Sequence, residues 1–216
     1  AGDDTRHWGP PFVGEESAYF LSINRNKRSL TLNFKDPEAI KIFLQLAKDA
    51  DVIVENFTPG VMARFGLDYE TVKGVNPKIV YCSISGFGQT GPYQSRPAYD
   101  QIMQGISGIM SITGEPDGEP QKVGIAVTDI GAGMWSAFAV MTAIFHREQK
   151  GEGQYIDISM MDSQVAWLTY QAATYFANDE PPKRLGAAHP TLVPYQAFMC
   201  KDGKYINVAA GSERIW

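Results

Sequence analysis

Asp129 is the carboxylate in this sequence best placed to do chemistry, because it stands at the entrance to a nearly all-apolar helix predicted over residues 128–149. Asp at a helix start commonly accepts hydrogen bonds from backbone N–H groups, so a plain capping role is the favoured interpretation of this residue alone. A helix terminus also keeps a carboxylate ionised, as a nucleophile requires. The glycines of Gly131-Ala132-Gly133 leave room for a bulky acyl group, so covalent catalysis stays open.

A second candidate is the glycine loop Gly86-Phe87-Gly88-Gln89-Thr90-Gly91, which matches the dinucleotide-binding fingerprint and follows a predicted strand at 78–84. It makes a nicotinamide-dependent oxidoreductase one alternative. In that motif the glycines open a helix whose N-terminus binds the pyrophosphate, whereas here Pro92 follows at once and no helical periodicity comes after it. A flexible loop at the carboxyl end of a strand is the better interpretation, and such ends are where open α/β sheets bind ligands.

The histidines and cysteines carry weaker signals. His7, His146 and His189 are widely scattered, so no metal is expected. His146 ends a helix, where a structural role is favoured, whereas His189 lies in a loop and keeps a functional interpretation. Cys82 and Cys200 lie far apart in apolar stretches, which indicates a reducing compartment: the cytoplasm, or the mitochondrial matrix in a eukaryote.

Composition limits the class of function. Hydrophobic residues make up 44% and charged residues 20% of the 216 residues, as in ordinary globular proteins. The net charge of −5 argues against a general affinity for nucleic acid or anionic membranes, so neither partner is expected. The apolar segment 130–145 is shorter than the roughly 20 residues of a membrane-spanning helix and is expected to be a buried helix.

Alternating helices and strands position these residues. Asp36-Pro37 starts a predicted helix over 36–50, which runs into a β-branched strand at 51–55 and a turn cluster at 56–60. Further elements are short helices within 61–75, a strand at 78–84, a helix near 100–110, the apolar helix at 128–149, a strand at 155–158 and a helix at 162–177. This order predicts an α/β fold with a parallel sheet.

A polar, Pro-rich break near residue 180 divides the chain into a predicted large domain, 1–180, and the start of a smaller α+β domain, 181–216. Lys201-Asp202-Gly203-Lys204 predicts a hairpin turn between two strands of the smaller domain. That hairpin has too few residues to bury its own face, so further chain or a partner is expected to cover it.

Six stretches, in order and spacing over essentially the whole chain, resemble the class III CoA-transferases, the family of formyl-CoA transferase and the carnitine and bile-acid CoA-transferases. They cover residues 2–6, 24–29, 54–60, 83–92, 128–129 with the following helix, and 189–198. The resemblance implies a Rossmann-like large domain and a small domain in chains interlocked as a homodimer. Family members extend beyond both ends of this chain, so it is expected to be an internal fragment that exposes apolar surface and aggregates alone.

The resemblance also implies a mechanism, in which Asp129 attacks an acyl-CoA thioester and passes through an acyl-aspartyl anhydride and an aspartyl-CoA thioester. CoA then leaves on an acceptor carboxylate, with acyl-CoA and carboxylic acid as substrates and no permanently bound cofactor. The pattern is most similar to the succinyl-CoA:glutarate type. Transfer of CoA from succinyl-CoA or a similar ester to a dicarboxylic acid is therefore the expected activity.

Five further residues match positions that bind the CoA ester in the family: Leu32, Asn56, Phe57, Arg64 and Tyr99. Leu32 and Phe57 can pack on adenine, Asn56 can hydrogen-bond near it, and Arg64 can meet phosphate. Ordinary core, turn and surface roles for these residues stay open. Tyr99 matches a transferase tyrosine where the α-methylacyl-CoA racemase branch has histidine, so it favours transfer, with racemisation as the alternative.

Overall fold

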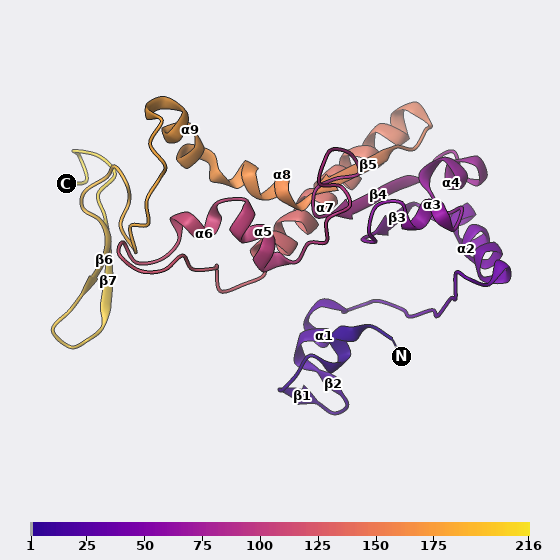
Figure 1. The fold of residues 1–216 in the computed structure, drawn as a ribbon, viewed down its shortest axis with the longest axis horizontal. Helices are drawn as coiled ribbons and strands as arrows, with labels where there is room; N and C mark the ends of the chain where they lie inside the picture. Colours follow the sequence, from indigo (N-terminus) through magenta and orange to yellow (C-terminus); the bar gives the residue numbers. More distant parts are fainter. Residues whose placement is uncertain (1) are drawn as a thin grey trace. The chain divides into compact units, whose positions relative to one another are not determined.

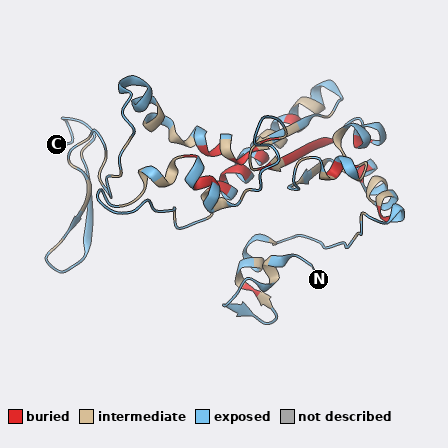
Figure 2. Ribbon diagram, in the orientation of Figure 1, coloured by how far each residue is buried: buried red, intermediate tan, exposed pale blue. Residues whose placement is uncertain are grey.

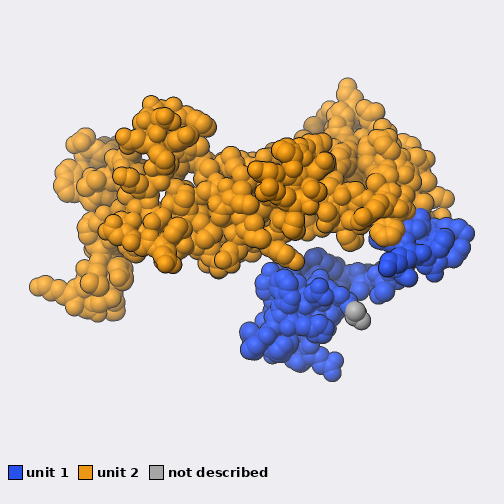
Figure 3. All heavy atoms as spheres, viewed as in Figure 1, with its two compact units in different colours: residues 1–43 blue, residues 44–216 orange. Residues whose placement is uncertain are grey.

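The computed structural model describes residues 2–216, so Ala1, with which the predicted large domain begins, lies outside the described residues. The chain divides into two compact units, residues 1–43 and residues 44–216, which Figure 3 distinguishes by colour. The domain boundary near residue 180 stays a prediction.

The first unit is built from short elements: the 3₁₀ helix η1 (Asp4–His7), the antiparallel strands β1 (Phe12–Val13) and β2 (Glu16–Ser17), and helix α1 (Ala18–Ile23). Asp3 caps η1, because its Oδ1 accepts a hydrogen bond from Thr5 N at 2.8 Å. Hydrogen bonds from Thr5 also hold the pKa of Asp3 below its usual value. Arg6 pairs with Glu16 and stacks over Phe20, which ties η1 to the elements after it.

A three-stranded parallel sheet forms the centre of the second unit, as the alternation of elements predicts. Its strands are β3 (Val52–Glu55), β4 (Val80–Ser85) and β5 (Tyr155–Ser159), in the order β3-β4-β5. The register pairs Val54 with Cys82 and Cys82 with Ile156. The central strand β4 is the most deeply buried, and Figure 2 shows it as a continuous buried segment.

The helices before and between these strands confirm most of the predicted ones. They are α2 (Pro37–Asp49), α3 (Val61–Arg64), α4 (Tyr69–Val75), α5 (Asp100–Ile106), α6 (Ile109–Ile112) and α7 (Val127–Lys150). The longest, α7, packs against β4, β5, α5 and α8 (Met160–Val165) (Figure 1). It is therefore the central crossover helix that connects the β4 region to β5.

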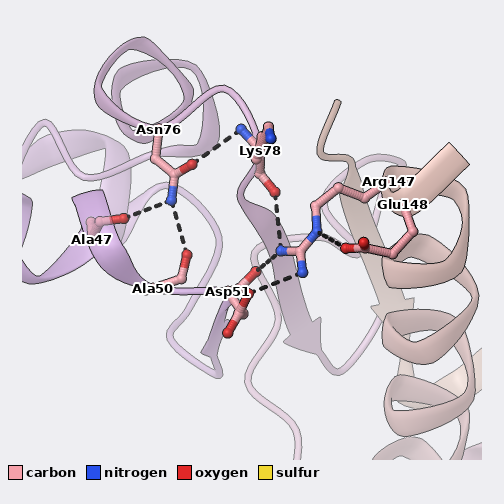
Figure 4. A network of polar contacts seen from close by, with 7 residues as sticks. All are labelled: Ala47, Ala50, Asp51, Asn76, Lys78, Arg147 and Glu148. Carbon is pink, nitrogen blue, oxygen red and sulfur yellow. Dashed lines mark hydrogen bonds and ion pairs between the residues drawn. The ribbon is translucent and has the colours of Figure 1, made fainter. Parts of the chain in front are cut away.

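The last turn of α7 is tied to the amino edge of the sheet (Figure 4). Arg147 Nη2 lies 2.9 Å from Asp51 Oδ1, and Arg147 Nη1 donates to Lys78 O at 3.4 Å. Asp51 and Lys78 precede β3 and β4, so the C-terminus of α7 lies at the amino ends of the parallel strands. The first turn of α7, which carries Asp129, therefore lies toward their carboxyl ends.

Asn76 makes a second connection at this edge (Figure 4). Its Nδ2 donates to Ala47 O and Ala50 O, both at 2.9 Å, and its Oδ1 accepts from Lys78 N at 3.1 Å. The buried amide thereby gives the Ala50 carbonyl a hydrogen-bond donor and adds a second donor at Ala47 O, which also accepts from Ala50 N at 3.4 Å.

One predicted helix is broken. Where the pattern predicts a single helix over 162–177, the structure has α8, the 3₁₀ helix η2 (Ala166–Leu168) and α9 (Thr169–Asn178). Thr169 adopts a φ of 41°, which a β-branched residue rarely adopts and a continuous α-helix cannot contain. The interruption results from the backbone conformation of Thr169, which the spacing of apolar residues does not predict.

Segment 130–145 is helical as predicted, but the prediction that this helix is buried is wrong. One face of α7 is open to solvent, with exposures between 47% and 69% for Ile130, Met134, Phe138, Met141 and Phe145. The helix has 24 residues, so by length and hydropathy it could span a membrane, a criterion that core helices of soluble proteins also meet. These five residues form the open face of α7.

The predicted hairpin is confirmed. Strands β6 (Tyr195–Met199) and β7 (Tyr205–Ala209) pair antiparallel, with Phe198 opposite Ile206. Gly203 takes a φ of 78° in the turn between them, the left-handed conformation that glycine adopts without strain. Met199 and Tyr205 are each 69% exposed, so the hairpin is uncovered in the part of the chain that the structure describes.

Candidate active site

The carboxyl edge of the sheet gathers the loops that carry the predicted site. Asn56 follows β3, and its Nδ2 donates to Ile84 O in β4 at 2.7 Å. Gly86 follows β4, and its carbonyl accepts from Met161 N, in the first turn after β5, at 3.0 Å. Asp129 comes to the same edge from α7, so this edge is where a ligand of an open α/β sheet is expected to bind.

Asp129 is the third residue of α7, and it does not cap that helix. The N-cap position is Ala126, which has no side-chain hydrogen bond to offer, and Asp129 itself is exposed. Among residues 2–216, none donates a hydrogen bond to the Asp129 carboxylate. The capping interpretation, favoured from the residue alone, is therefore wrong.

The pKa of Asp129 is raised above its usual value, first by the partial burial of the carboxylate among surrounding protein atoms and then by the negative charge of Asp100. The expectation that the helix terminus alone sets the ionisation is therefore incomplete. One turn further along α7, Ala132 packs with Met103 and Met160 in a buried apolar cluster. Asp129 thus lies next to this apolar cluster, which limits the access of water from that side.

The cap that α7 lacks comes from helix α5. Asp100 Oδ1 accepts a hydrogen bond from Thr128 N at 2.8 Å, and Asp100 Oδ2 accepts from Gln104 Nε2 at 2.7 Å. Thr128 Oγ1 donates to Gln164 Oε1 in α8 at 2.9 Å. The sequence pattern did not single out Asp100, Gln104 or Gln164. The bonds from Thr128 to Asp100 and Gln164 join separate helices and leave no local signal, whereas Asp100 and Gln104 form an i, i+4 pair within α5.

The room expected around the Gly131-Ala132-Gly133 segment exists at only one of its two glycines. A Cβ at Gly131 would lie 3.1 Å from the Trp167 ring, so this glycine permits close packing with η2. A Cβ at Gly133 would meet no atom of the described residues within 4 Å. Space for an acyl group is therefore not provided by Gly131.

The residues predicted to bind CoA fall on four short segments. Phe57 is 47% exposed in the loop after β3, and Arg64 is exposed in the last turn of α3, with no partner among the described residues. Asn56 uses its Nδ2 in the bond to Ile84, so its carbonyl oxygen remains for a ligand. Leu32 is partly buried in the unit 1–43, where it lines a cavity with Asp3 and Leu30, while the other predicted residues belong to the unit 44–216.

Tyr99 is 72% exposed and occupies the N-cap position of α5. It directly precedes Asp100, whose carboxylate binds the first turn of α7. Tyr99 and Asp129 therefore come from two helices that pack together, α5 and α7.

The dinucleotide fingerprint does not form the geometry that its letters suggest. Gly88 and Gly91 have φ angles of 84° and 89°, and residues 86–99 contain no helix. Gln89 N donates a hydrogen bond to Asp157 Oδ2 at 2.9 Å. This loop N–H is therefore already bonded to a carboxylate and is not available to a phosphate. The prediction of a glycine loop is confirmed, and it provides no helix N-terminus for a pyrophosphate.

A cavity of about 240 Å³ lies beside the loop after β3. Glu55, Asp68 and Glu70 line part of it, so it would repel a phosphate group. Asp129, Arg64 and the other predicted CoA-binding residues do not line it. This cavity is therefore not assigned to CoA.

His189 has a structural environment. Its Nδ1 accepts from Thr191 N and Leu192 N, both at 3.2 Å, and its ring lies 5.0 Å from that of Tyr195. Within residues 2–216, no group of three or more His, Cys, Asp or Glu side chains could hold a metal ion.

The sequence profile of CoA-transferase family III matches residues 1–216. The succinyl-CoA:glutarate CoA-transferase of Homo sapiens is 48% identical over 99% of this chain and 49% of its own length. The succinate–glutarate CoA-transferase of Agrobacterium fabrum is 48% identical over 98% of this chain and 54% of its own length. The crystal structure of a CAIB/BAIF family protein from Brucella suis has a TM-score of 0.90 and 47% identity, over 97% of this chain and 56% of that one. The chain thus spans about half the length of the curated relatives it matches.

Proposed function

Because this chain belongs to CoA-transferase family III, we propose that it carries the nucleophile of an enzyme that transfers CoA between carboxylic acids. The donor proposed is succinyl-CoA or a similar acyl-CoA, and the acceptor is a dicarboxylic acid such as glutarate. The names of the two relatives that are 48% identical support this pair of substrates. The observation that carries the proposal is the exposed carboxylate of Asp129, which has a raised pKa and no hydrogen-bond donor among the described residues.

The proposed reaction uses this carboxylate twice. An Asp129 oxygen attacks the thioester carbonyl, the C–S bond breaks, and CoA leaves as a thiolate with a mixed anhydride on Asp129. The thiolate then attacks the Cγ of Asp129, which releases the donor acid as a carboxylate and forms an aspartyl-CoA thioester. No proton or electron is gained or lost in these two steps.

The second half of the reaction mirrors the first. The acceptor carboxylate attacks the aspartyl-CoA thioester, CoA thiolate leaves, and a new anhydride forms. The thiolate attacks the acceptor carbonyl, which releases acceptor-CoA and restores the Asp129 carboxylate. The thioester's free energy is retained only if water is kept away, which the apolar cluster of Met103, Ala132 and Met160 favours.

For CoA itself we propose a binding role for Asn56, Phe57, Arg64 and Tyr99 in the unit 44–216 and, separately, for Leu32 in the unit 1–43. Phe57 and Arg64 present an accessible ring and an unpaired guanidinium, the groups that adenine and phosphate need. We further propose a homodimer in a reducing compartment. The open face of α7 and the uncovered hairpin β6–β7 support an interface, and the free thiols of Cys82 and Cys200 support the compartment.

The test is to trap the activated carboxylate in the full-length chain. Protein incubated with succinyl-CoA is quenched with hydroxylamine, and the hydroxamate is located by peptide mass spectrometry. We expect it at Asp129 and expect Asp129→Ala to abolish it, while Asp162→Ala, the third residue of α8, retains it. A folded protein that gives no adduct with several acyl-CoAs would overturn the proposal.

Racemisation is the other reaction that this test must separate from transfer. Tyr99 matches the position where the racemase branch has histidine, whose imidazole suits the removal and return of an α-proton. We therefore expect no exchange of the α-proton of a 2-methylacyl-CoA with deuterated water. Exchange at a rate comparable to CoA transfer would favour the racemase.

A further inference from the structure

The first turn of α7 is held by side chains from two other helices instead of by a cap of its own. Ala126 occupies the N-cap position without a side-chain acceptor, and Asp100 of α5 accepts from Thr128 N in its place. Thr128 is 1% exposed, so this N–H would be an unsatisfied buried donor without Asp100. The neighbouring residue, Asp129, is thereby fixed through its own backbone.

Two buried amides complete the arrangement. Gln104 is fully buried; its Nε2 donates to Asp100 Oδ2 at 2.7 Å and its Oε1 accepts from Val123 N at 2.8 Å. Gln164, 2% exposed, accepts from the Thr128 hydroxyl at 2.9 Å. Gln104 therefore orients the Asp100 carboxylate, and Gln164 holds Thr128 from the side of α8.

We propose that Asp100 is a positioning residue for the nucleophile: oriented by Gln104, it caps the first turn of α7 at Thr128 and places a second negative charge beside Asp129. This inference rests on the proposed function of Asp129. Asp100 does not touch the substrate in this role. It acts through Asp129, by geometry and by charge.

The charge of Asp100 changes the reactivity of Asp129. It raises the pKa of Asp129 in addition to the larger effect of burial. The other ionisable groups on the elements packed against α7 are Tyr81 and Cys82 on β4, Tyr155 and Asp157 on β5, and Asp162 on α8, and none of them is a cause of this shift. A carboxylate of higher pKa is a stronger nucleophile once it is ionised. Asp100 therefore lowers the fraction of Asp129 that is ionised at low pH and makes the ionised carboxylate more reactive near neutral pH.

Charge and geometry can be separated by substitution in the full-length chain. Asp100→Asn removes the charge and keeps an oxygen acceptor for Thr128 N, but its amide nitrogen replaces the oxygen that accepts from Gln104 Nε2, so that bond is lost as well. Thr128→Val keeps the backbone N–H and the charge and removes the hydroxyl bond to Gln164. Asp162→Asn is the matched control, because it removes an acidic side chain from α8 that does not contact the site.

The readout is the pH dependence of single-turnover hydroxamate formation with succinyl-CoA. For Asp100→Asn we expect the acidic limb of the profile to move to lower pH by about half a unit, because a like charge no longer opposes ionisation of Asp129. For Thr128→Val we expect the limb to stay in place and the plateau rate to fall about tenfold, through loss of orientation. Asp162→Asn is expected to match the parent in both respects.

The outcomes distinguish the two proposals. An adduct at Asp129 in the parent, with the acidic limb unmoved in Asp100→Asn, would overturn the positioning role and leave the nucleophile in place. Absence of any adduct in the folded parent would overturn both. Since Asp100→Asn is nearly isosteric, a far-ultraviolet circular dichroism spectrum and melting temperature close to the parent's will show that a changed profile is not a folding defect.

Discussion

At the scale of the residue, Asp129 has a property that suits a nucleophile and costs stability. Its carboxylate is accessible, lacks a hydrogen-bond donor among the described residues and has a raised pKa. A carboxyl group whose pKa is higher in the folded state than in the unfolded chain destabilises the fold when it is ionised. Functional groups held in unfavourable surroundings are a common origin of such a cost.

Replacing Asp129 should therefore stabilise the protein in a pH-dependent way. For Asp129→Asn we expect a higher urea midpoint at pH 7, where the parent carboxylate is ionised and both burial and Asp100 oppose the charge. The difference should shrink as the pH falls through the raised pKa and vanish below the ordinary value of 3.8, where both states of the parent are protonated. Urea unfolding followed by tryptophan fluorescence between pH 7 and pH 4 measures this. A gain that is the same at every pH would contradict the assignment of the effect to ionisation.

At the scale of the element, α7 serves two purposes in one helix. Its first turn presents Asp129, and its last turn anchors the amino edge of the sheet through Arg147. Its two glycines differ in surroundings: Gly131 packs against Trp167, and Gly133 faces open space in the described part of the chain. Glycine in a helix interior lowers the free energy of unfolding by about 1 kcal/mol relative to alanine. The close contact with Trp167 accounts for glycine at position 131, but no such contact exists at Gly133 among the described residues.

The two glycines form a matched pair for substitution. Gly133→Ala should raise the free energy of unfolding by up to about 1 kcal/mol, because it gains helix propensity without a clash. Gly131→Ala should gain less or lose stability, because the new Cβ would lie 3.1 Å from the Trp167 ring. Chemical denaturation of both variants gives the two values. Equal gains at both positions would mean that Trp167 moves aside at no cost.

At the scale of the whole molecule, the chain leaves apolar surface uncovered. The open face of α7 presents five large apolar side chains, and α9 adds Phe176 at 82% exposure. Continuous apolar patches of this kind are typical of surfaces that another part of the polypeptide or a partner covers.

The 216-residue chain by itself should therefore self-associate. We expect it to bind 8-anilinonaphthalene-1-sulfonate and to elute as oligomers in size-exclusion chromatography with light scattering. Introducing charge on the open face, with Phe138→Glu and Met141→Glu together, should shift the elution toward monomer. Thr174→Glu, at an exposed polar position of α9, is the control for a charge added elsewhere. A parent chain that is monodisperse and binds no dye would contradict the expectation.

The sequence by itself determined most of the elements and their order, because their signals are local. Asp36-Pro37 places the start of α2 within one residue, Asp202-Gly203 places the β6–β7 turn, and the alternation of strands and helices predicts a parallel sheet. The resemblance to the CoA-transferases likewise depended on short motifs whose order along the chain is visible without a structure. These features depend on neighbours a few residues away.

The tertiary structure decided what surrounds Asp129. Its helix is capped by Asp100, 28 residues before Thr128 in the chain, and the Thr128 hydroxyl binds Gln164, 36 residues after it. Trp167 fills the space at Gly131, and one face of α7 is left open, although the apolar pattern had predicted burial all round. Hydropathy records which side chains avoid water, and only packing determines which neighbours meet them, because such contacts join segments with no relation in sequence.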